Sequence, residues 1–318
     1  MECKTSFIAA SACMMTISLP LPPLKPSVLS HLALLMVAII YGANYNIAKM
    51  VMFKYLNPSG FIVLRIGGAG LLFVLIWWLF YREKIERADI RKLIICSALG
   101  VAGNMLMFFK GLSLTTPVNA SVLMLVSPVF VLIFSSIVFK TQPAWFHYFG
   151  ILLSFTGAVV LIGGKNIHVG SDTFTGDLFI IGNAISYAFY LVYVKELLFK
   201  YKSMTVIALL FTFGFFMVLP FGLGDLQEAS FSTFPATVWW AIVFVVLGTT
   251  FLAYLLNAWA LQKTSSEIVG SYIYLQPIIA SAIGVSLGQD VLTIGKIVAA
   301  MLIFGGVFLV SRKSKIRM

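Results

Sequence analysis

Ten apolar runs, each about twenty residues long, constrain this chain of 318 residues more than any other feature. A helix of about twenty residues, rising 1.5 Å per residue, crosses the roughly 30 Å of hydrocarbon in a bilayer. Only helices or a closed barrel satisfy their backbone in lipid, and continuous apolar runs without strict alternation indicate helices. The runs cover residues 30–51, 58–80, 91–112, 118–139, 144–164, 177–199, 204–224, 237–260, 267–288 and 293–311.

The composition excludes several classes of protein. Hydrophobic residues make up 60% of the chain and charged residues only 10%, whereas soluble domains carry roughly 25% charge. The same balance excludes a disordered chain. Three cysteines are too few for a disulfide scaffold. Most of the Lys and Arg behind the net charge of +11 flank apolar runs, so we expect no nucleic-acid partner. The sequence therefore predicts an all-α integral membrane protein.

The positions of Lys and Arg also predict an orientation. Cytoplasmic loops are enriched in these residues, and most of the 22 fall on one side if both termini are placed in the cytoplasm. We therefore expect a multi-pass protein of the plasma (inner) membrane with both termini cytoplasmic, ending in a basic tail at 312–318. Residues 1–29 are expected to be a disordered leader. The alternative is a cleavable signal, because Phe7 to Leu19 is a mildly apolar run after Lys4.

The second half of the chain repeats the first. An offset of 149 residues places Pro128 on Pro277, and an offset of 146 places Tyr41 on Tyr187. Each half holds five apolar runs, an odd number, so the second half enters the membrane from the opposite side. We predict ten transmembrane helices as an inverted 5+5 repeat. Such repeats, with a site where they meet, are typical of secondary transporters.

Three stretches carry a family resemblance: Tyr41-Gly42-Ala43-Asn44, the region around Ser127-Pro128, and Leu275-Gln276-Pro277 with the later Gly305-Gly306-Val307. On these the chain resembles EamA-type members of the drug/metabolite transporter superfamily, as two tandem EamA units at 30–164 and 177–311. The resemblance implies ten helices, cytoplasmic termini, a central cavity and usually export of small metabolites. Many members have Glu after the glycine that closes the ninth helix. This chain has Gln289-Asp290 there, so no role is carried over to that position.

Polar side chains near mid-membrane are the candidates for binding a solute. A buried amide or hydroxyl needs a partner, and a ring of such groups would bind a small polar or aromatic molecule. Hydrogen bonding between helices is the alternative reading of each residue. The candidates are Tyr41, Asn44, Asn104, Ser127, Tyr187, Tyr190, Tyr254 and Gln276.

Two cations add to this set. Arg65 lies about seven residues into the second run, or roughly 10 Å deep. An intramembrane charge costs at least ~2.5 kcal/mol and is functional by default. With Lys110, near the outer end of the third run, it would favour carboxylates or phosphates. Alternatively, Lys110 snorkels to the interface and Arg65 ties loops or carbonyls together.

Two prolines and the acidic residues bear on mechanism. Pro128 and Pro277 each remove a helical hydrogen bond, so we expect hinges there, with static kinks as the alternative. All Asp and Glu lie in loops or at the ends of apolar runs, so no acid near mid-membrane offers a proton relay.

The sequence predicts a secondary transporter, an exporter of small organic metabolites such as amino acids, working by alternating access at a midplane cavity. No HExxH motif, Ser/His/Asp set, metal-ligand cluster or Walker motif is present. We therefore expect no enzyme activity, no cofactor, no metal and no ATP. The partners are a small-molecule substrate and the lipid bilayer, and a monomer suffices. A membrane-embedded enzyme or a channel is the competing reading.

Overall fold

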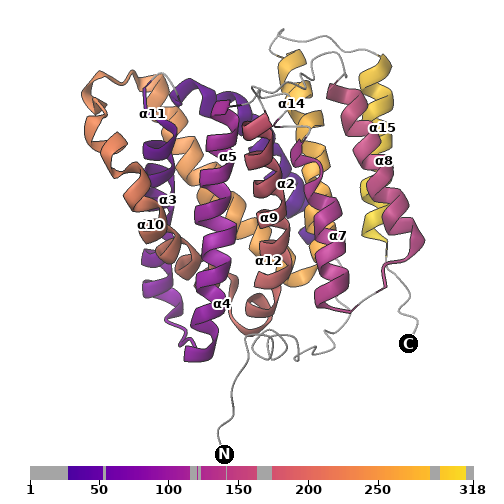
Figure 1. Cartoon of the computed structure of the whole chain (residues 1–318), viewed down its shortest axis with the longest axis horizontal. Helices are drawn as coiled ribbons and strands as arrows, with labels where there is room; N and C mark the ends of the chain where they lie inside the picture. Colours follow the sequence, from indigo (N-terminus) through magenta and orange to yellow (C-terminus); the bar gives the residue numbers. More distant parts are fainter. Residues whose placement is uncertain are drawn as a thin grey trace, which may run out of the picture.

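The computed structural model describes residues 28–52, 55–114, 120, 123–140, 142–162, 174–286 and 294–312. This part of the chain is a bundle of helices without a β-sheet (Figure 1). The all-α prediction is confirmed. The expected leader up to residue 27, Gln289-Asp290 and the tail after residue 312 lie outside the described residues.

The first half of the bundle contains short segments that join into longer helices. Helix α3 continues into the π-helical turn η1, and α4, η2 and α5 form one rod. The elements are α2 (Val28–Val51), α3 (Pro58–Ile76), η1 (Trp77–Tyr81), α4 (Arg87–Ser97), η2 (Ala98–Ala102), α5 (Gly103–Leu114), α7 (Ser127–Val138) and α8 (Trp145–Ile162).

The second half is built in the same way. The segments α11, η5 and α12 form one rod, with η5 again π-helical. The elements are α9 (Phe174–Lys200), α10 (Ser203–Glu228), η4 (Phe231–Thr233), α11 (Ala236–Val243), η5 (Phe244–Leu252), α12 (Ala253–Lys263), α13 (Ser266–Ser271), η6 (Tyr272–Tyr274), α14 (Leu275–Ser286) and α15 (Ile294–Ser311).

Each of the ten predicted apolar ranges is mostly helical over its described part. Five helices of the described chain are long and apolar enough to cross a membrane: Pro58–Tyr81, Arg87–Leu114, Phe174–Lys200, Ser203–Glu228 and Ala236–Lys263. Shorter apolar helices lie at Val28–Asn44, Ser127–Val138 and Ile297–Val310.

Local sequence explains several helix ends. Pro58 is the first residue of α3, where its missing N–H costs no helical hydrogen bond. The Ser265 side chain accepts a hydrogen bond from the Ile268 N–H and so caps α13. The helix ending in η1 stops at Arg82, whose φ of 37° lies in the left-handed region.

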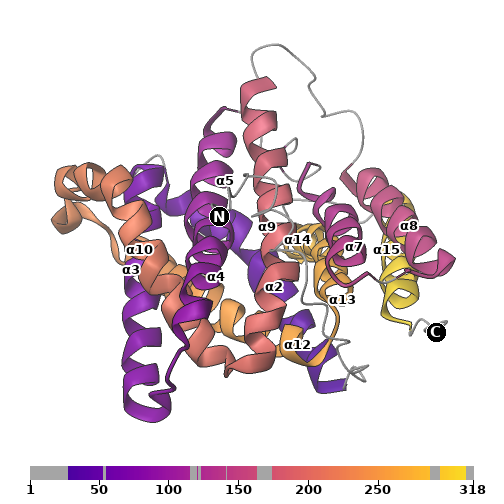
Figure 2. The ribbon, with the colours of Figure 1, turned by 60° about the horizontal axis from the view of Figure 1, so that its bottom comes forward.

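The helices pack in pairs. Helices α8 and α15 lie side by side at one edge of the bundle, and α3 and α10 at the opposite edge (Figures 1 and 2). Between them α5 and α7 pack on α9, and α12 and α14 pack on α2. The α8–α15 contact depends on glycine, because a Cβ at Gly306 would lie 2.4 Å from the Gly150 carbonyl oxygen.

Candidate functional site

A cavity of about 150 Å³ lies between the two halves of the chain. Helices α2, α3 and α5 of the first half and α9, α12 and α14 of the second contribute side chains to it. Seven of its lining residues were predicted from the sequence: Tyr41, Asn44, Arg65, Asn104, Tyr187, Tyr254 and Gln276. The rest of the lining is Met52, Met105, Phe108, Phe109, Leu112, Ala120, Met124, Asn183 and Ile273.

Hydrogen bonds between helices fix several of the polar groups. Asn257 Nδ2 donates to the Tyr187 hydroxyl at 3.0 Å, which joins α12 to α9. Thr249 Oγ1 donates to Asn44 Oδ1 at 3.2 Å, which joins η5 to α2. Tyr187 and Asn44 therefore make hydrogen bonds between helices and also line the cavity, so the two alternatives considered for buried polar groups both apply to them.

Asn183 was not predicted, although it lines the cavity. Its side chain is buried, and Nδ2 donates to the Asn104 carbonyl oxygen at 2.6 Å. It lies about six residues into its apolar run, closer to the end than the depth at which candidates were sought. The presence of an amide side chain inside an apolar run could have identified Asn183 as a candidate.

The π-helical segments η2 and η5 lie in the middle of the two long rods. A π-helical turn frees backbone carbonyls and is frequent at functional sites. In η2 the Gly100 carbonyl accepts a hydrogen bond from the Tyr254 hydroxyl at 3.5 Å, and the Leu99 carbonyl accepts one from Ser186 Oγ at 2.7 Å. The segment η2 therefore supplies backbone acceptors, one of them to Tyr254 of the cavity lining.

Arg65 is buried, with 7% of its surface exposed, and its side chain lines the cavity. Its Nε donates to Thr250 Oγ1 of η5 at 3.0 Å, and Cζ lies 5.9 Å from the centre of the Phe109 ring. Within the described part of the chain no Asp or Glu forms an ion pair with it. The guanidinium is thus a charge held in the protein interior, and none of the described Asp and Glu residues is its counter-ion.

Three candidates lie outside the cavity lining. Lys110 is exposed near the end of α5. Ser127 is buried and its Oγ donates to the Ala184 carbonyl at 3.3 Å. Tyr190 is buried against Gly100, where a Cβ would lie 2.2 Å from its ring.

The two prolines occupy matching positions. Pro128 lies in the first turn of α7, after a turn at residues 125–126. Pro277 lies in the first turn of α14, directly after the 3-10 segment η6. Each proline therefore marks a break within a predicted apolar range, where the backbone leaves and re-enters the α conformation.

The chain matches the family model described as the EamA-like transporter family at residues 28–163 and 174–312. It belongs to that family. The predicted resemblance, with two tandem units, is confirmed, and the chain is a membrane transporter with several membrane-spanning helices.

Named relatives of this EamA-family chain agree with that assignment. It is 25% identical over 287 residues to the uncharacterized transporter YyaM of Bacillus subtilis, covering 88% of this chain and 93% of the relative. An uncharacterized transporter of Archaeoglobus fulgidus is 28% identical over 255 residues, covering 78% and 86%. The uncharacterized inner membrane transporter YicL of Salmonella typhimurium is 23% identical over 292 residues, covering 90% and 96%.

A solved structure shares the fold. The crystal structure of a protein superposes with a TM-score of 0.73 at 16% identity, covering 88% of this chain and 96% of that one. At this identity the likeness shows the fold alone.

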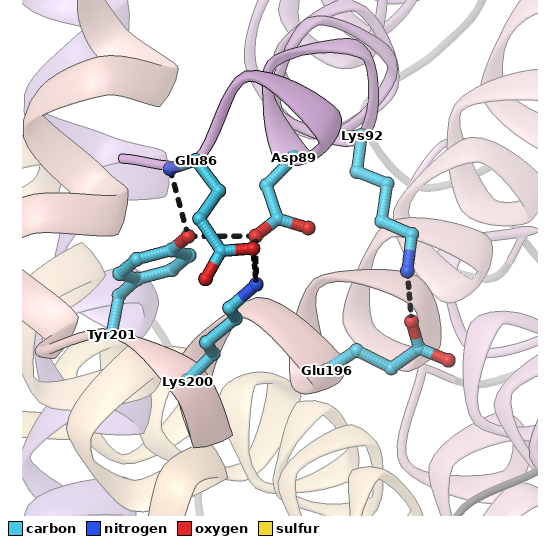
Figure 3. Close-up of polar contacts among 6 residues, drawn as sticks. All are labelled: Glu86, Asp89, Lys92, Glu196, Lys200 and Tyr201. Atoms are coloured by element: carbon cyan, nitrogen blue, oxygen red, sulfur yellow. Dashed lines mark hydrogen bonds and ion pairs between the residues drawn. The ribbon is translucent and has the colours of Figure 1, made fainter. Parts of the chain in front are cut away.

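Charged side chains join the halves at one end of the bundle, in what we call the charged contact (Figure 3). Lys200 Nζ lies 2.5 Å from Glu86 Oε2 and 2.7 Å from Asp89 Oδ2. The Tyr201 hydroxyl donates to Asp89 Oδ2 at 2.7 Å and accepts from the Glu86 N–H at 3.1 Å. Burial and the hydrogen bond to Asp89 raise the pKa of Tyr201, so its hydroxyl stays protonated at neutral pH.

A second ion pair completes the charged contact. Lys92 Nζ of α4 lies 2.5 Å from Glu196 Oε2 of α9, and both side chains are about a third exposed. The start of the third predicted span is thereby fastened to the end of the sixth.

Aromatic rings join the halves at the opposite end, in what we call the aromatic contact. The Tyr55 ring, between α2 and α3, lies 5.6 Å from the ring of Phe234, which precedes α11. Phe234 in turn lies 5.8 Å from Trp239. Asp225 Oδ2 accepts a hydrogen bond from the Gly60 N–H at 3.2 Å. Each end of the bundle is therefore held by contacts between the halves, with different chemistry.

Proposed function

We propose that this transporter exports small organic metabolites, such as amino acids, across the plasma membrane by alternating access at the cavity between its halves. The observation that carries the proposal is the cavity itself, because predicted polar residues from both halves converge on it. A site shared by two halves changes shape when one half moves against the other.

The packing of the helices supports an inverted 5+5 repeat of ten spans. Helix α5 of the third predicted span packs on α9 of the sixth. Their counterparts in the other half, α12 of the eighth span and α2 of the first, are also in contact. The same holds for α7 with α9 and α14 with α2. In the pairs α3–α10 and α8–α15, each helix packs on its own counterpart in the other half. A two-fold relation between residues 30–164 and 177–311 accounts for all of these contacts.

Matching irregularities support the same relation. The π-helical segments η2 and η5 occupy equivalent places in the third and eighth predicted spans. Pro128 and Pro277 follow equivalent breaks in the fourth and ninth. We propose these breaks as the hinges, because a broken helix bends without loss of further hydrogen bonds.

Basic side chains support cytoplasmic termini. The charged contact and its flanking loops carry Arg82, Lys84, Arg87, Arg91 and Lys202, near the end where α2 begins. Cytoplasmic loops have such an excess. With this end inside, both termini lie in the cytoplasm.

Counterflow in liposomes tests the proposal. The purified protein is reconstituted, the vesicles are loaded with one unlabelled amino acid or organic acid, and uptake of the same labelled solute is followed. A carrier gives saturable uptake that internal solute accelerates. Uptake that rises linearly with concentration and ignores internal solute would show a channel and overturn the proposal. Accumulation of a solute outside cells that express the protein, and not outside cells that lack it, tests the direction.

A further inference from the structure

The charge of the cavity bears on the solute it binds. Of the described residues that line it, Arg65 alone carries a charge, and Asp and Glu are absent from that lining. A buried charge without a counter-ion is costly, and the cost is relieved when a ligand supplies the opposite charge. This further step rests on the proposed function of the same cavity.

The hydrogen bonds of Arg65 leave part of its guanidinium unused. Nε donates to Thr250 Oγ1 at 3.0 Å, which fixes the plane of the group. Within the described residues its two terminal nitrogens make no hydrogen bond. Two terminal N–H groups held in one plane match the two oxygens of a carboxylate.

The rest of the lining is apolar or neutral. Phe108, Phe109 and Met105 of α5 form an apolar wall, with the Phe109 ring 5.9 Å from the Arg65 guanidinium. Tyr41, Asn104 and Gln276 add neutral hydrogen-bonding groups. The cavity of about 150 Å³ is smaller than the 300–1,000 Å³ of pockets for drug-sized ligands.

We propose that the cavity selects small organic acids with a single carboxylate and an apolar body, the carboxylate bound to Arg65 and the body packed against Phe108 and Phe109. A second carboxylate would be buried without a counter-ion, a cation would be repelled by Arg65, and a neutral solute would leave the guanidinium unpaired. Arg65 therefore recognises the carboxylate, and the apolar wall beside it recognises the body of the solute.

A series of probes with one shared body tests this. Calorimetric titration of the purified protein uses 3-phenylpropionate, the neutral 3-phenylpropionamide, the dianion phenylsuccinate and the cation 3-phenylpropylamine. We expect 3-phenylpropionate to bind at least about tenfold more tightly than each of the others, since a hydrogen bond to a charged group is worth roughly a tenfold to hundredfold change in Kd. Equal or tighter binding of the amide, or no binding of 3-phenylpropionate, would overturn the inference.

Variants assign the effect to Arg65. Arg65→Gln should weaken 3-phenylpropionate by about tenfold to a hundredfold and leave the amide unchanged. Arg65→Lys keeps the charge without the planar guanidinium and should lose about tenfold in affinity for 3-phenylpropionate. This variant replaces Arg65→Gln in the test if the Gln variant does not fold. Lys84→Gln removes one exposed cation far from the cavity and should change nothing. An equal loss in Lys84→Gln and Arg65→Gln would contradict the assignment.

The failure of this inference and that of the proposed function can be told apart. Arg65-dependent binding of 3-phenylpropionate without counterflow of any solute would overturn the transport mechanism and support the selectivity. Counterflow that is the same for anionic, neutral and cationic probes would support transport and overturn the selectivity.

Discussion

Arg65 of α3 donates through Nε to Thr250 Oγ1 of η5 at 3.0 Å, so one half of the chain orients the charged residue of the other. Thr250 Oγ1 also donates to the Val245 carbonyl at 2.7 Å. The hydroxyl therefore has a donor and an acceptor, both buried, and its position is fixed within η5. We therefore expect a movement of η5 against α3 to reorient the guanidinium or to break this hydrogen bond.

Thr250→Val should therefore weaken the affinity for a carboxylate solute. The valine keeps the shape but leaves Nε without its acceptor, which costs about 1–3 kcal/mol, or roughly fivefold to 150-fold in Kd. Titration with 3-phenylpropionate measures this. The control is Thr212→Val, because among the described residues Thr212 Oγ1 bonds the Ala208 carbonyl of its own helix alone. Equal affinities in the two variants would contradict the role of Thr250.

Tyr41→Ala and Tyr187→Ala should each abolish flux while leaving insertion into the membrane intact. Both side chains line the cavity from α2 and α9, and Tyr187 also accepts the hydrogen bond from Asn257. Counterflow and the amount of protein in membranes are measured together. Tyr148→Ala, at an exposed position on α8, should transport normally. Normal transport by both cavity variants would refute the site.

Reversing the Lys92–Glu196 pair tests the charged contact. Lys92→Glu and Glu196→Lys each place like charges together and should slow or speed counterflow by a few fold, because a pair about a third exposed contributes roughly 0.2–1 kcal/mol. The double variant restores the attraction and should return the rate toward that of the unmodified protein. If the double variant deviates as much as the sum of the singles, the pair does not couple the halves.

Gly306→Val should destabilise the α8–α15 pair. A Cβ there would lie 2.0 Å from Ser154 Oγ and 2.4 Å from the Gly150 carbonyl oxygen, and such overpacking costs about 1–3 kcal/mol. Gly305→Ala is the matched control, since its Cβ would meet Leu153 at an ordinary 3.5 Å. Thermal unfolding in detergent should show a lower Tm for the valine variant alone. An unchanged Tm would mean that the helices separate more easily than their packing indicates.

Tags on the two ends of the chain should react from the same side of the membrane. The prediction follows from the positions of the basic residues near the charged contact. Intact cells and inside-out vesicles are treated with a protease or an impermeant label, and we expect both tags to react only in the inverted vesicles. Tags on opposite sides would contradict an even number of spans.

The apolar runs were sufficient to predict the helices, because backbone satisfaction in lipid leaves few alternatives. They did not predict the breaks within helices. Nothing in the run 91–112 distinguishes the π-helical turn at η2 from the α-helix around it, because its residues are as apolar as their neighbours. Such turns depend on the packing of the neighbouring helices, which the sequence of one helix does not contain.

The lining of the cavity was predicted only in part, because it also depends on how neighbouring helices pack. Depth along a helix is readable from the sequence, and it identified Tyr41, Asn104 and Gln276. Rotation about the helix axis is not readable where all faces are apolar. Tyr190 lies at a suitable depth but turns towards Gly100 and away from the cavity. Thr250, which accepts the hydrogen bond from Arg65, could not be predicted as part of the site, because its role depends on contact with a helix far away in the sequence.

The contacts at the two ends of the bundle answer to different properties of the surroundings. The Debye length falls from about 8 Å at physiological salt to about 3 Å at 1 M, so high ionic strength weakens the partly exposed Lys92–Glu196 ion pair. Cold weakens apolar association, so chilling loosens the side of Tyr55 and Phe234. If the halves move as proposed, we expect ionic strength and temperature to act on opposite ends of the bundle, and so to shift in opposite directions the balance between the two states.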